Sequence, residues 1–232
     1  MLLVIAALSE ELRIARELSR GCTSGVYLVK SGVGPKRAAI ALSHFLQTHQ
    51  VRKILAFGYA GALDSDLKIG DLLAARRVVC IGERAAPGTP LECMESEGSW
   101  EVPTEDLACF EPGIHWGDVL TSPFVIGDPK HKELLRARFK TAAVDMETGA
   151  FARVASAAGV PFSAIRAISD EAQDSFLAPL SYPARSGTAK AAQVLLAGHW
   201  VRRYKDWTER ASVARESLRR FLAAYLTHQS RQ

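Results

Sequence analysis

Short apolar runs alternate with stretches of helical periodicity along most of this sequence. LLVIAAL precedes SEELRIARELSR, GVYLVK precedes PKRAAIALSHFLQTHQ, and KILAFGY and DLLAARRVVCIG follow. The pattern resumes with the apolar runs WGDVLTS, TAAVDM and PFSAIRAIS, which are separated by PKHKELLRARF and ETGAFARVASAAG. Because strands that alternate with helices usually form a covered sheet, the sequence predicts an α/β fold with a largely parallel or mixed central sheet.

Length and composition predict one domain. With 232 residues and 48% hydrophobic content the chain can bury a substantial core, so we expect a single domain over residues 1–232. A C-terminal helical extension is expected from about residue 183, as two helices interrupted near residues 205–207. Residues 85–112 lack clear periodicity and predict a long surface loop, either a substrate lid or a passive insertion.

Several classes of site and location are disfavoured. The four cysteines form no CxxC pair and have no His at metal-ligand spacing, so we expect neither a metal site nor a disulfide framework. The first residues lack the positive leader of a signal peptide, and no apolar run approaches the roughly 18 residues that span a bilayer. These features predict a cytoplasmic protein.

The C-terminal segment is basic. Residues 183–232 contain ten Lys or Arg residues against three acids, whereas the whole chain carries a net charge of +4. A solvated helix face is the simplest explanation. Peripheral contact with the inner face of a membrane is the alternative, and nucleic-acid binding is not expected because no recognised motif accompanies the charge.

Polar residues follow the predicted strands at their carboxyl ends, where ligands gather in α/β sheets. They fall in residues 9–11, 31–34, 58–61, 145–147 and 169–170, with glycine turns among them. Simpler roles also exist for the carboxylates. Asp145 can cap a helix, which we prefer to a catalytic role; Glu11 and Glu147 can be surface glutamates stabilised by a helix dipole; and Asp170 can end a strand.

The stretch KSGVGPKRA, residues 30–38, partly matches a dinucleotide fingerprint. Arg37 stands where the third glycine is required, and no Asp or Glu occurs in residues 18–63 to hold a cofactor ribose. A nicotinamide dehydrogenase is therefore disfavoured. A tight turn in which Pro35 starts a helix explains the stretch equally well.

Five stretches in order resemble the nucleoside phosphorylase and nucleosidase family, especially the nucleosidases that cleave adenine from methylthioadenosine and adenosylhomocysteine. They are the opening strand with Glu11, KSGVG at 30–34, GYAGALDSDLKIGDLL at 58–73, VDMETGAF at 144–151 and RAISDEA at 166–172. The resemblance covers most of the first 175 residues. It implies a three-layer α/β/α fold with a central mixed sheet, and an enzyme without metal or organic cofactor.

The resemblance also implies roles around the scissile bond. A purine is a poor leaving group, so its ring must be protonated while the sugar acquires oxocarbenium character. Asp170 matches the acid that acts toward purine N7, which requires a proton on that carboxyl and hence removal from water. Glu147 matches the acceptor for the ribose hydroxyls, and Met146 the residue that packs against the sugar. The remaining implied substrate contacts are Phe124 stacked on the purine, Val125 through its backbone, Gly58, Tyr59, Ala60, Gly61 and Ser169.

Two stretches of the sequence bear on whether water or phosphate attacks the sugar. Glu11 matches the nucleosidase glutamate that activates water, which implies hydrolysis. Related phosphorylases carry an arginine just before the glycine-rich turn of strand three, where this chain has Ala56 and Phe57. Tyr59 replaces the small residue that the family usually has, so a water or phosphate contact there is not carried over.

Two alternatives stay open. Phosphorolysis would need phosphate as a co-substrate and donors to hold it. A catalytically silent nucleoside or lipid carrier is disfavoured because binding alone requires no acid and base pair. The residues available for phosphate are Gly34, Arg37 and Arg166.

The tail resembles the hopanoid-associated phosphorylase branch of the family. That resemblance implies removal of adenine from adenosylhopane, a lipid-linked nucleoside, and the family's habits imply a homodimer or larger assembly. A basic and aromatic mixture suits a membrane interface, although the tryptophans can equally pack helices together. The residues concerned are Trp200, Arg202, Arg203, Tyr204, Lys205 and Trp207.

Overall fold

A mixed sheet forms the centre of the computed structural model, which describes residues 1–20, 25–83, 89–111, 113–175 and 197–230, with side chains of the last helix described from Ala211 onward. The sheet has eight strands in this part of the chain. They are β1 (Leu2–Ala6), β2 (Val26–Lys30), β3 (Lys53–Ala62), β4 (Leu72–Ile81), β5 (Ser96–Glu101), β6 (His115–Thr121), β7 (Ala143–Asp145) and β8 (Phe162–Asp170).

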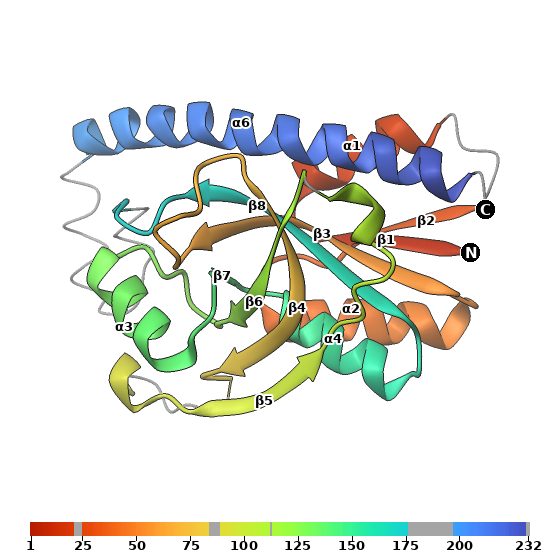
Figure 1. Ribbon diagram of the computed structural model, residues 1–232, viewed down its shortest axis with the longest axis horizontal. Coiled ribbons are helices and arrows are strands. Elements are labelled where there is room, and N and C mark those ends of the chain that lie inside the picture. Colours follow the sequence, from red (N-terminus) through yellow and green to blue (C-terminus); the bar gives the residue numbers. More distant parts are fainter. Residues whose placement is uncertain (21–24, 84–88, 112, 176–196, 231–232) are drawn as a thin grey trace.

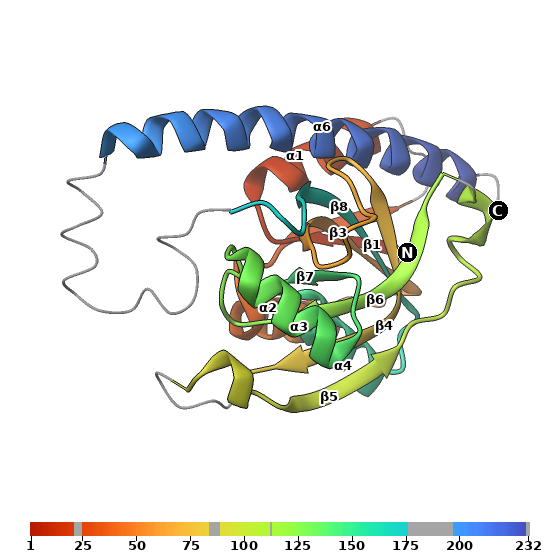
Figure 2. The same ribbon diagram turned by 60° about the vertical axis from the view of Figure 1, so that its left-hand side comes forward.

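Helices cover both faces of the sheet (Figure 1). On one face α6 lies along the sheet beside α1, and on the other α2 packs against α4 (Figure 2). The three-layer α/β/α architecture with a mixed sheet is therefore confirmed. The described helices are α1 (Ser9–Ser19), α2 (Pro35–Thr48), α3 (Pro129–Phe139), α4 (Thr148–Ala157) and α6 (Ala197–Gln229), with short 3-10 turns at Leu91–Cys93 and Ala108–Phe110.

The first strand shows why a three-layer structure forms. All five residues of β1 are buried, and alternate side chains enter different cores. Leu3 and Ile5 pack in the core beneath α2 and α4, whereas Leu2 and Val4 pack in the core beneath α1 and α6. A strand that is apolar on both faces is stable only when both faces are covered.

The strand pairings close into a ring. The order is β2-β1-β3-β7-β6-β4-β5, and β8 pairs with β3 in parallel and with β4 antiparallel. The remaining pairs include the antiparallel β3–β7 contact and the parallel β6–β7 and β4–β6 contacts. The strands β3, β7, β6, β4 and β8 thus surround a common interior, which brings the ends of β1, β7 and β8 to one edge.

The segment 85–112 contains structure that the sequence did not predict. Residues 96–101 form β5, which pairs antiparallel with β4 at the margin of the sheet. The polar sequence of β5 obscured it, because none of its residues is fully buried and the strand therefore lacks an apolar run. None of the described residues of this segment lines the cavity presented below, so the structure gives no support to a substrate lid there.

The described part of the C-terminal extension is one continuous helix from Ala197 to Gln229, so the predicted interruption near residues 205–207 is wrong, while residues 183–196 lie outside the described residues. Its C-terminal half buries Leu218, Leu222 and Tyr225, and the Tyr225 hydroxyl donates to Asp106 over 2.7 Å. These contacts continue the apolar stripe across several turns, so the helix is held by packing. The basic and aromatic side chains of residues 200–207 lie outside the described part.

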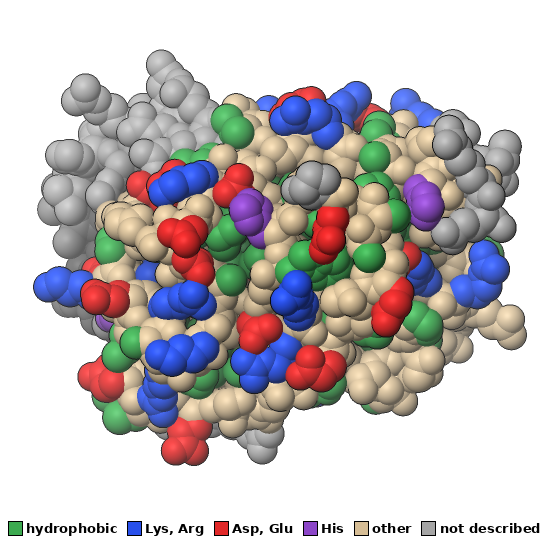
Figure 3. All heavy atoms as spheres, viewed as in Figure 1, with side chains coloured by type: hydrophobic (Ala, Val, Ile, Leu, Met, Phe, Trp, Pro, Cys, Tyr) green, Lys and Arg blue, Asp and Glu red, His purple; other side chains and the backbone are tan. Residues whose placement is uncertain are grey.

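Charges of both signs are interspersed on the face seen in Figure 3. Lys and Arg alternate with Asp and Glu there, an arrangement unlike the single-sign surface that steers nucleic acid. Among the described helices, none combines the length and hydropathy needed to cross a membrane.

We expect Leu222→Ala to lower the free energy of unfolding by about 2–5 kcal/mol, because Leu222 is fully buried and the truncation leaves a cavity. Urea denaturation measures the change. Val213→Ala is the control on the same helix, since Val213 is 50% exposed and its loss should cost little. Equal, small effects of both variants would mean that α6 is not part of the cooperative core.

Candidate active site

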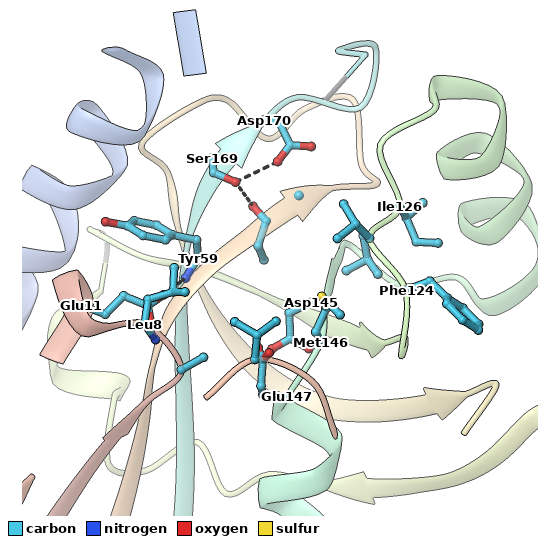
Figure 4. A pocket seen from close by; sticks show the side chains of 16 residues that line it. Leu8, Glu11, Tyr59, Phe124, Ile126, Asp145, Met146, Glu147, Ser169 and Asp170 are labelled. Atoms are coloured by element: carbon cyan, nitrogen blue, oxygen red, sulfur yellow. Dashed lines mark hydrogen bonds between the residues drawn. The ribbon is translucent and has the colours of Figure 1, made fainter. Parts of the chain in front are cut away.

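A cavity of about 390 Å³ lies where the strand ends meet (Figure 4). Most of its wall is apolar, with carboxylates at several points. The described lining residues are Ala7, Leu8, Glu11, Val33, Tyr59, Ala60, Gly61, Phe124, Val125, Ile126, Val144, Asp145, Met146, Glu147, Ser169 and Asp170.

Most predicted site residues meet at this cavity. Ten of them line it, from Glu11 near the N-terminus to Asp170 at the end of β8. The four that do not line it are Gly34, Arg37, Gly58 and Arg166. Lining residues that sequence reasoning missed are Ala7, Leu8, Val33, Ile126 and Val144, small or apolar side chains whose types carry no chemical signal.

Glu11 is positioned by the start of α1. Its carboxylate accepts the Leu8 backbone N–H over 2.8 Å and the Tyr59 backbone N–H over 3.2 Å. The side chain is 3% exposed, so it is not the surface glutamate of the simpler interpretation. Burial raises the pKa of Glu11 to about 7, an effect that these hydrogen bonds and the charge of Arg166 only partly offset.

Two glycines of β3 allow carboxylates to approach the sheet. A Cβ at Gly58 would lie 2.7 Å from Oε1 of Glu11, and a Cβ at Gly61 would lie 2.8 Å from Oδ2 of Asp170. Both glycines lie within β3, so the predicted turn at 58–61 is wrong; the strand instead shifts register between Ala60 and Gly61. Close approach explains why glycine is needed there.

Asp145 and Arg166 form a buried ion pair beneath the cavity. Arg166 Nε donates to Asp145 Oδ2 over 2.9 Å, and its guanidinium also donates to Thr148 Oγ1. Asp145 accepts the Thr121 hydroxyl and the Thr148 backbone N–H and hydroxyl as well. It therefore serves the start of α4 as expected, although Glu147 occupies the N-cap position.

Glu147 links the cavity to the glycine turn after β2. Its Oε1 accepts the Gly34 N–H over 2.7 Å, and the side chain is 8% exposed, so the surface interpretation is wrong here too. Gly34 has φ +97°, a conformation that favours glycine. Burial, and then the charge of Asp145, raise the pKa of Glu147 to about 8.

None of the three residues considered for phosphate binding lines the cavity. The Gly34 N–H and the Arg166 guanidinium both serve carboxylates, and Arg37 is exposed on α2. The described lining of the cavity contains no lysine or arginine. The sequence could not indicate these pairings, because the partners lie far apart along the chain.

Asp170 has a partner that sequence reasoning missed. Lys132 of α3 places Nζ 2.5 Å from Asp170 Oδ2, and Ser169 Oγ donates to Oδ1 over 2.8 Å. Lys132 is fully buried although it sits in a strongly charged helical stretch. The sequence prediction considered only the removal of the Asp170 carboxyl group from water. The structure adds an ammonium group that contacts this carboxyl group.

Two aromatic residues flank the cavity. In Figure 4 the Phe124 ring points away from the cavity centre, whereas Tyr59 lies beside Glu11. Tyr59 also packs against the core beneath α6, and its hydroxyl is buried without a hydrogen-bond partner in the described part of the chain. Burial accordingly raises the pKa of Tyr59.

Within the described residues no group of three His, Cys, Asp or Glu side chains is placed to hold a metal ion. The polar groups of the cavity are instead carboxylates that suit acid and base chemistry and hydrogen bonding to hydroxyls.

Comparison with known proteins supplies the family. The model of the phosphorylase superfamily matches residues 17–226. This chain belongs to the phosphorylase superfamily. The matched range contains thirteen of the sixteen described lining residues, including Glu147 and Asp170, whereas Ala7, Leu8 and Glu11 precede it.

Relatives of this superfamily member include nucleosidases. The 5'-methylthioadenosine/S-adenosylhomocysteine nucleosidase of Bacillus subtilis is 31% identical over 197 residues, covering 73% of this chain and 85% of that protein. The crystal structure of the Helicobacter pylori nucleosidase with butyl-thio-DADMe-Immucillin-A has a TM-score of 0.71 at 20% identity, over 98% of this chain and 97% of the other. The futalosine hydrolase of Helicobacter pylori has a TM-score of 0.65 at 20% identity, over 96% of each chain. The last two likenesses confirm the fold.

We expect Glu147→Gln to stabilise the protein at alkaline pH. A carboxyl whose pKa rises from 4.5 to about 8 on folding contributes stability below pH 4.5 that is lost as the pH rises through about 8. Glutamine keeps an oxygen for the Gly34 N–H but does not ionise. The melting temperature of the variant relative to wild type should therefore rise between pH 5 and pH 9, by roughly 2–4 °C for each kcal/mol relieved.

Glu133→Gln is the matched control, because Glu133 is exposed on α3. A melting-temperature difference for Glu147→Gln that does not change with pH would contradict the assigned pKa.

Proposed function

We propose that this protein hydrolyses the N-ribosidic bond of an adenine nucleoside and releases adenine. The observation that carries the proposal is that Glu11, a buried carboxyl with a pKa of about 7, faces the same cavity as Asp170 and Glu147. The nucleosidase relatives named above support the substrate class.

Glu11 is the proposed general base. A base is most effective when its pKa lies near the working pH, and Glu11 meets this condition through burial. Two backbone N–H groups hold its carboxylate, so it is oriented before water arrives. It takes a proton from water as the oxygen attacks C1′.

Glu147 and Met146 are proposed to hold the sugar. Glu147 presents carboxyl oxygens that can accept hydrogen bonds from ribose hydroxyls, and Met146 adds an apolar surface beside it. For the base, Phe124 is proposed to stack on the purine, which requires its ring to turn inward from the orientation in Figure 4. Val125 would offer its backbone groups, and Asp170 would act toward N7.

Phosphorolysis is the less favoured candidate. Phosphate binding requires cationic or N–H donors, and the donors considered for it are engaged with Asp145 and Glu147. Every lining carboxyl that is ionised would also repel a phosphate dianion, and the described lining contains no Lys or Arg to offset this. No metal or organic cofactor is required, because a base and an acid suffice for the proposed hydrolysis.

Free adenine and the sugar product, measured with and without phosphate, test the proposed reaction. We expect adenine and free ribosyl product without phosphate. Adenine released only with phosphate, together with a ribose 1-phosphate, would establish phosphorolysis instead.

We expect Glu11→Gln and Asp170→Asn each to lower the turnover of an adenine nucleoside about 10²–10⁴-fold, because each removes one proton-transfer group. The wild-type rate should fall as the pH decreases through about 7, where Glu11 becomes protonated. Rate measurements from pH 5 to pH 9 check both statements. Glu10→Gln, next to Glu11 on α1, is the matched control; normal turnover in Glu11→Gln would contradict the mechanism.

For the 5′ substituent we propose a bulky apolar group, as in adenosylhopane. The apolar lining residues Leu8, Val33 and Ile126 support this, and Val33 is 42% exposed at the rim. The basic and aromatic residues 200–207 would rest on a membrane surface. We further propose that residues 1–232 act as one domain within a homodimer or larger assembly, with the exposed Ile40 of α2 available for contact.

We expect the double variant Trp200→Ser and Trp207→Ser to reduce binding to anionic liposomes and turnover of a membrane-held nucleoside, because interfacial tryptophans anchor amphipathic helices. Turnover of a soluble adenosine analogue should stay unchanged. Liposome co-sedimentation and adenine release measure the two effects. Trp116→Ser, at a partly buried tryptophan of β6, is the control, and equal losses on both substrates in the double variant would count against membrane contact.

A further inference from the structure

A fully buried lysine stands behind the proposed acid. Lys132 Nζ lies 2.5 Å from Asp170 Oδ2, 2.6 Å from the Glu171 carbonyl oxygen and 3.4 Å from the Asp174 carbonyl oxygen. An ammonium group has three N–H donors, so these acceptors account for all of them. The side chain has no exposed surface and does not line the cavity.

The contacts of Lys132 indicate a source for the proton that Asp170 would give to the purine. Both oxygens of Asp170 already accept hydrogen bonds, Oδ1 from Ser169 and Oδ2 from Lys132. In this arrangement both oxygens of Asp170 act as acceptors, and the Lys132 ammonium is the cationic donor in contact with Oδ2. The same ammonium ties the chain after β8 to α3 and so fixes the direction in which Asp170 points.

We propose that Lys132 is a positioning residue that acts through Asp170, holding its carboxylate and supplying the proton that Asp170 passes to the purine. This inference rests on the proposed function. As the C1′–N9 bond breaks, its electron pair moves into the purine. Asp170 takes a proton from Lys132, which becomes a neutral amine, and passes that proton to N7. Glu11 releases the proton of the attacking water to solvent, and Lys132 regains one after adenine leaves.

Other charged groups near the pair are accounted for. Glu171 pairs through its carboxylate with Lys68 over 3.3 Å, and its N–H donates to Asp174. Across the cavity, Glu11 and Glu147 are the facing carboxyls. The ammonium therefore contacts Asp170 as its ion-pair partner, while its other two contacts are backbone carbonyls.

Lys132→Gln tests the proposal, because glutamine keeps N–H donors for Asp170 but has no ammonium proton. Without that proton Asp170 must take one from solvent, which becomes difficult as the pH rises. We expect the variant's turnover of adenosine to be within about 10-fold of wild type at pH 6 and about 10²-fold lower at pH 9.

Two further measurements separate proton supply from a structural role. A 4-nitrophenyl riboside needs no acid, because nitrophenolate is a good leaving group, so the ratio of variant to wild-type rates on it should not change between pH 6 and pH 9. In an Asp170→Asn background, adding Lys132→Gln should lower adenosine turnover no further, because the asparagine that replaces Asp170 cannot pass a proton from Lys132 to N7. Lys130→Met, two residues earlier and exposed on α3, is the matched control.

The outcomes are distinct. A variant-to-wild-type ratio on adenosine that is the same at pH 6 and pH 9, or an additive loss in the double variant, would overturn the inference and leave the proposed hydrolysis intact. Wild-type protein that releases no adenine would overturn both. If Lys132→Gln does not fold, as judged by its melting curve, Lys132→Met assayed in the same way provides the comparison.

Discussion

Two buried cations allow four carboxylates to share one edge of the sheet. Arg166 pairs with Asp145 and Lys132 pairs with Asp170, both with almost no exposed surface. In the part of the chain that the structure describes, Glu11 and Glu147 have no such ion pair. They rely on backbone N–H groups, and burial raises the pKa of each. The two cations thus pair with Asp145 and Asp170, whereas Glu11 and Glu147 are left with raised pKa values.

The closed ring of strands brings these groups together. Because β8 pairs with both β3 and β4, Asp170 at the end of β8 lies against Gly61 of β3. Gly58, three residues earlier on β3, admits Glu11 from α1. A side chain at either glycine would collide with a carboxyl group, so β3 supports both the proposed base Glu11 and the proposed acid Asp170.

Sequence reasoning succeeded where periodicity was strong. The apolar runs correctly predicted β1, β2, β4, β6 and β8, and the resemblance selected ten residues that line the cavity. It failed where the signal depended on distant partners. The polar strand β5 is stabilised by pairing with β4, and α6 continues through residues 205–207 although its pattern weakens there. Lys132 was overlooked because a lysine in a charged helix is usually solvated.

The sequence by itself determined the order of strands and helices, the largely parallel or mixed central sheet and the residue types at its carboxyl edge. These follow from local periodicity and from apolar runs that must be buried on both faces. Only the tertiary structure decided which carboxylate meets which cation, which glycine admits a side chain, and which carboxyls have raised pKa values. Those properties depend on distances and burial between residues far apart in the chain, such as Lys132 with Asp170 and Gly34 with Glu147.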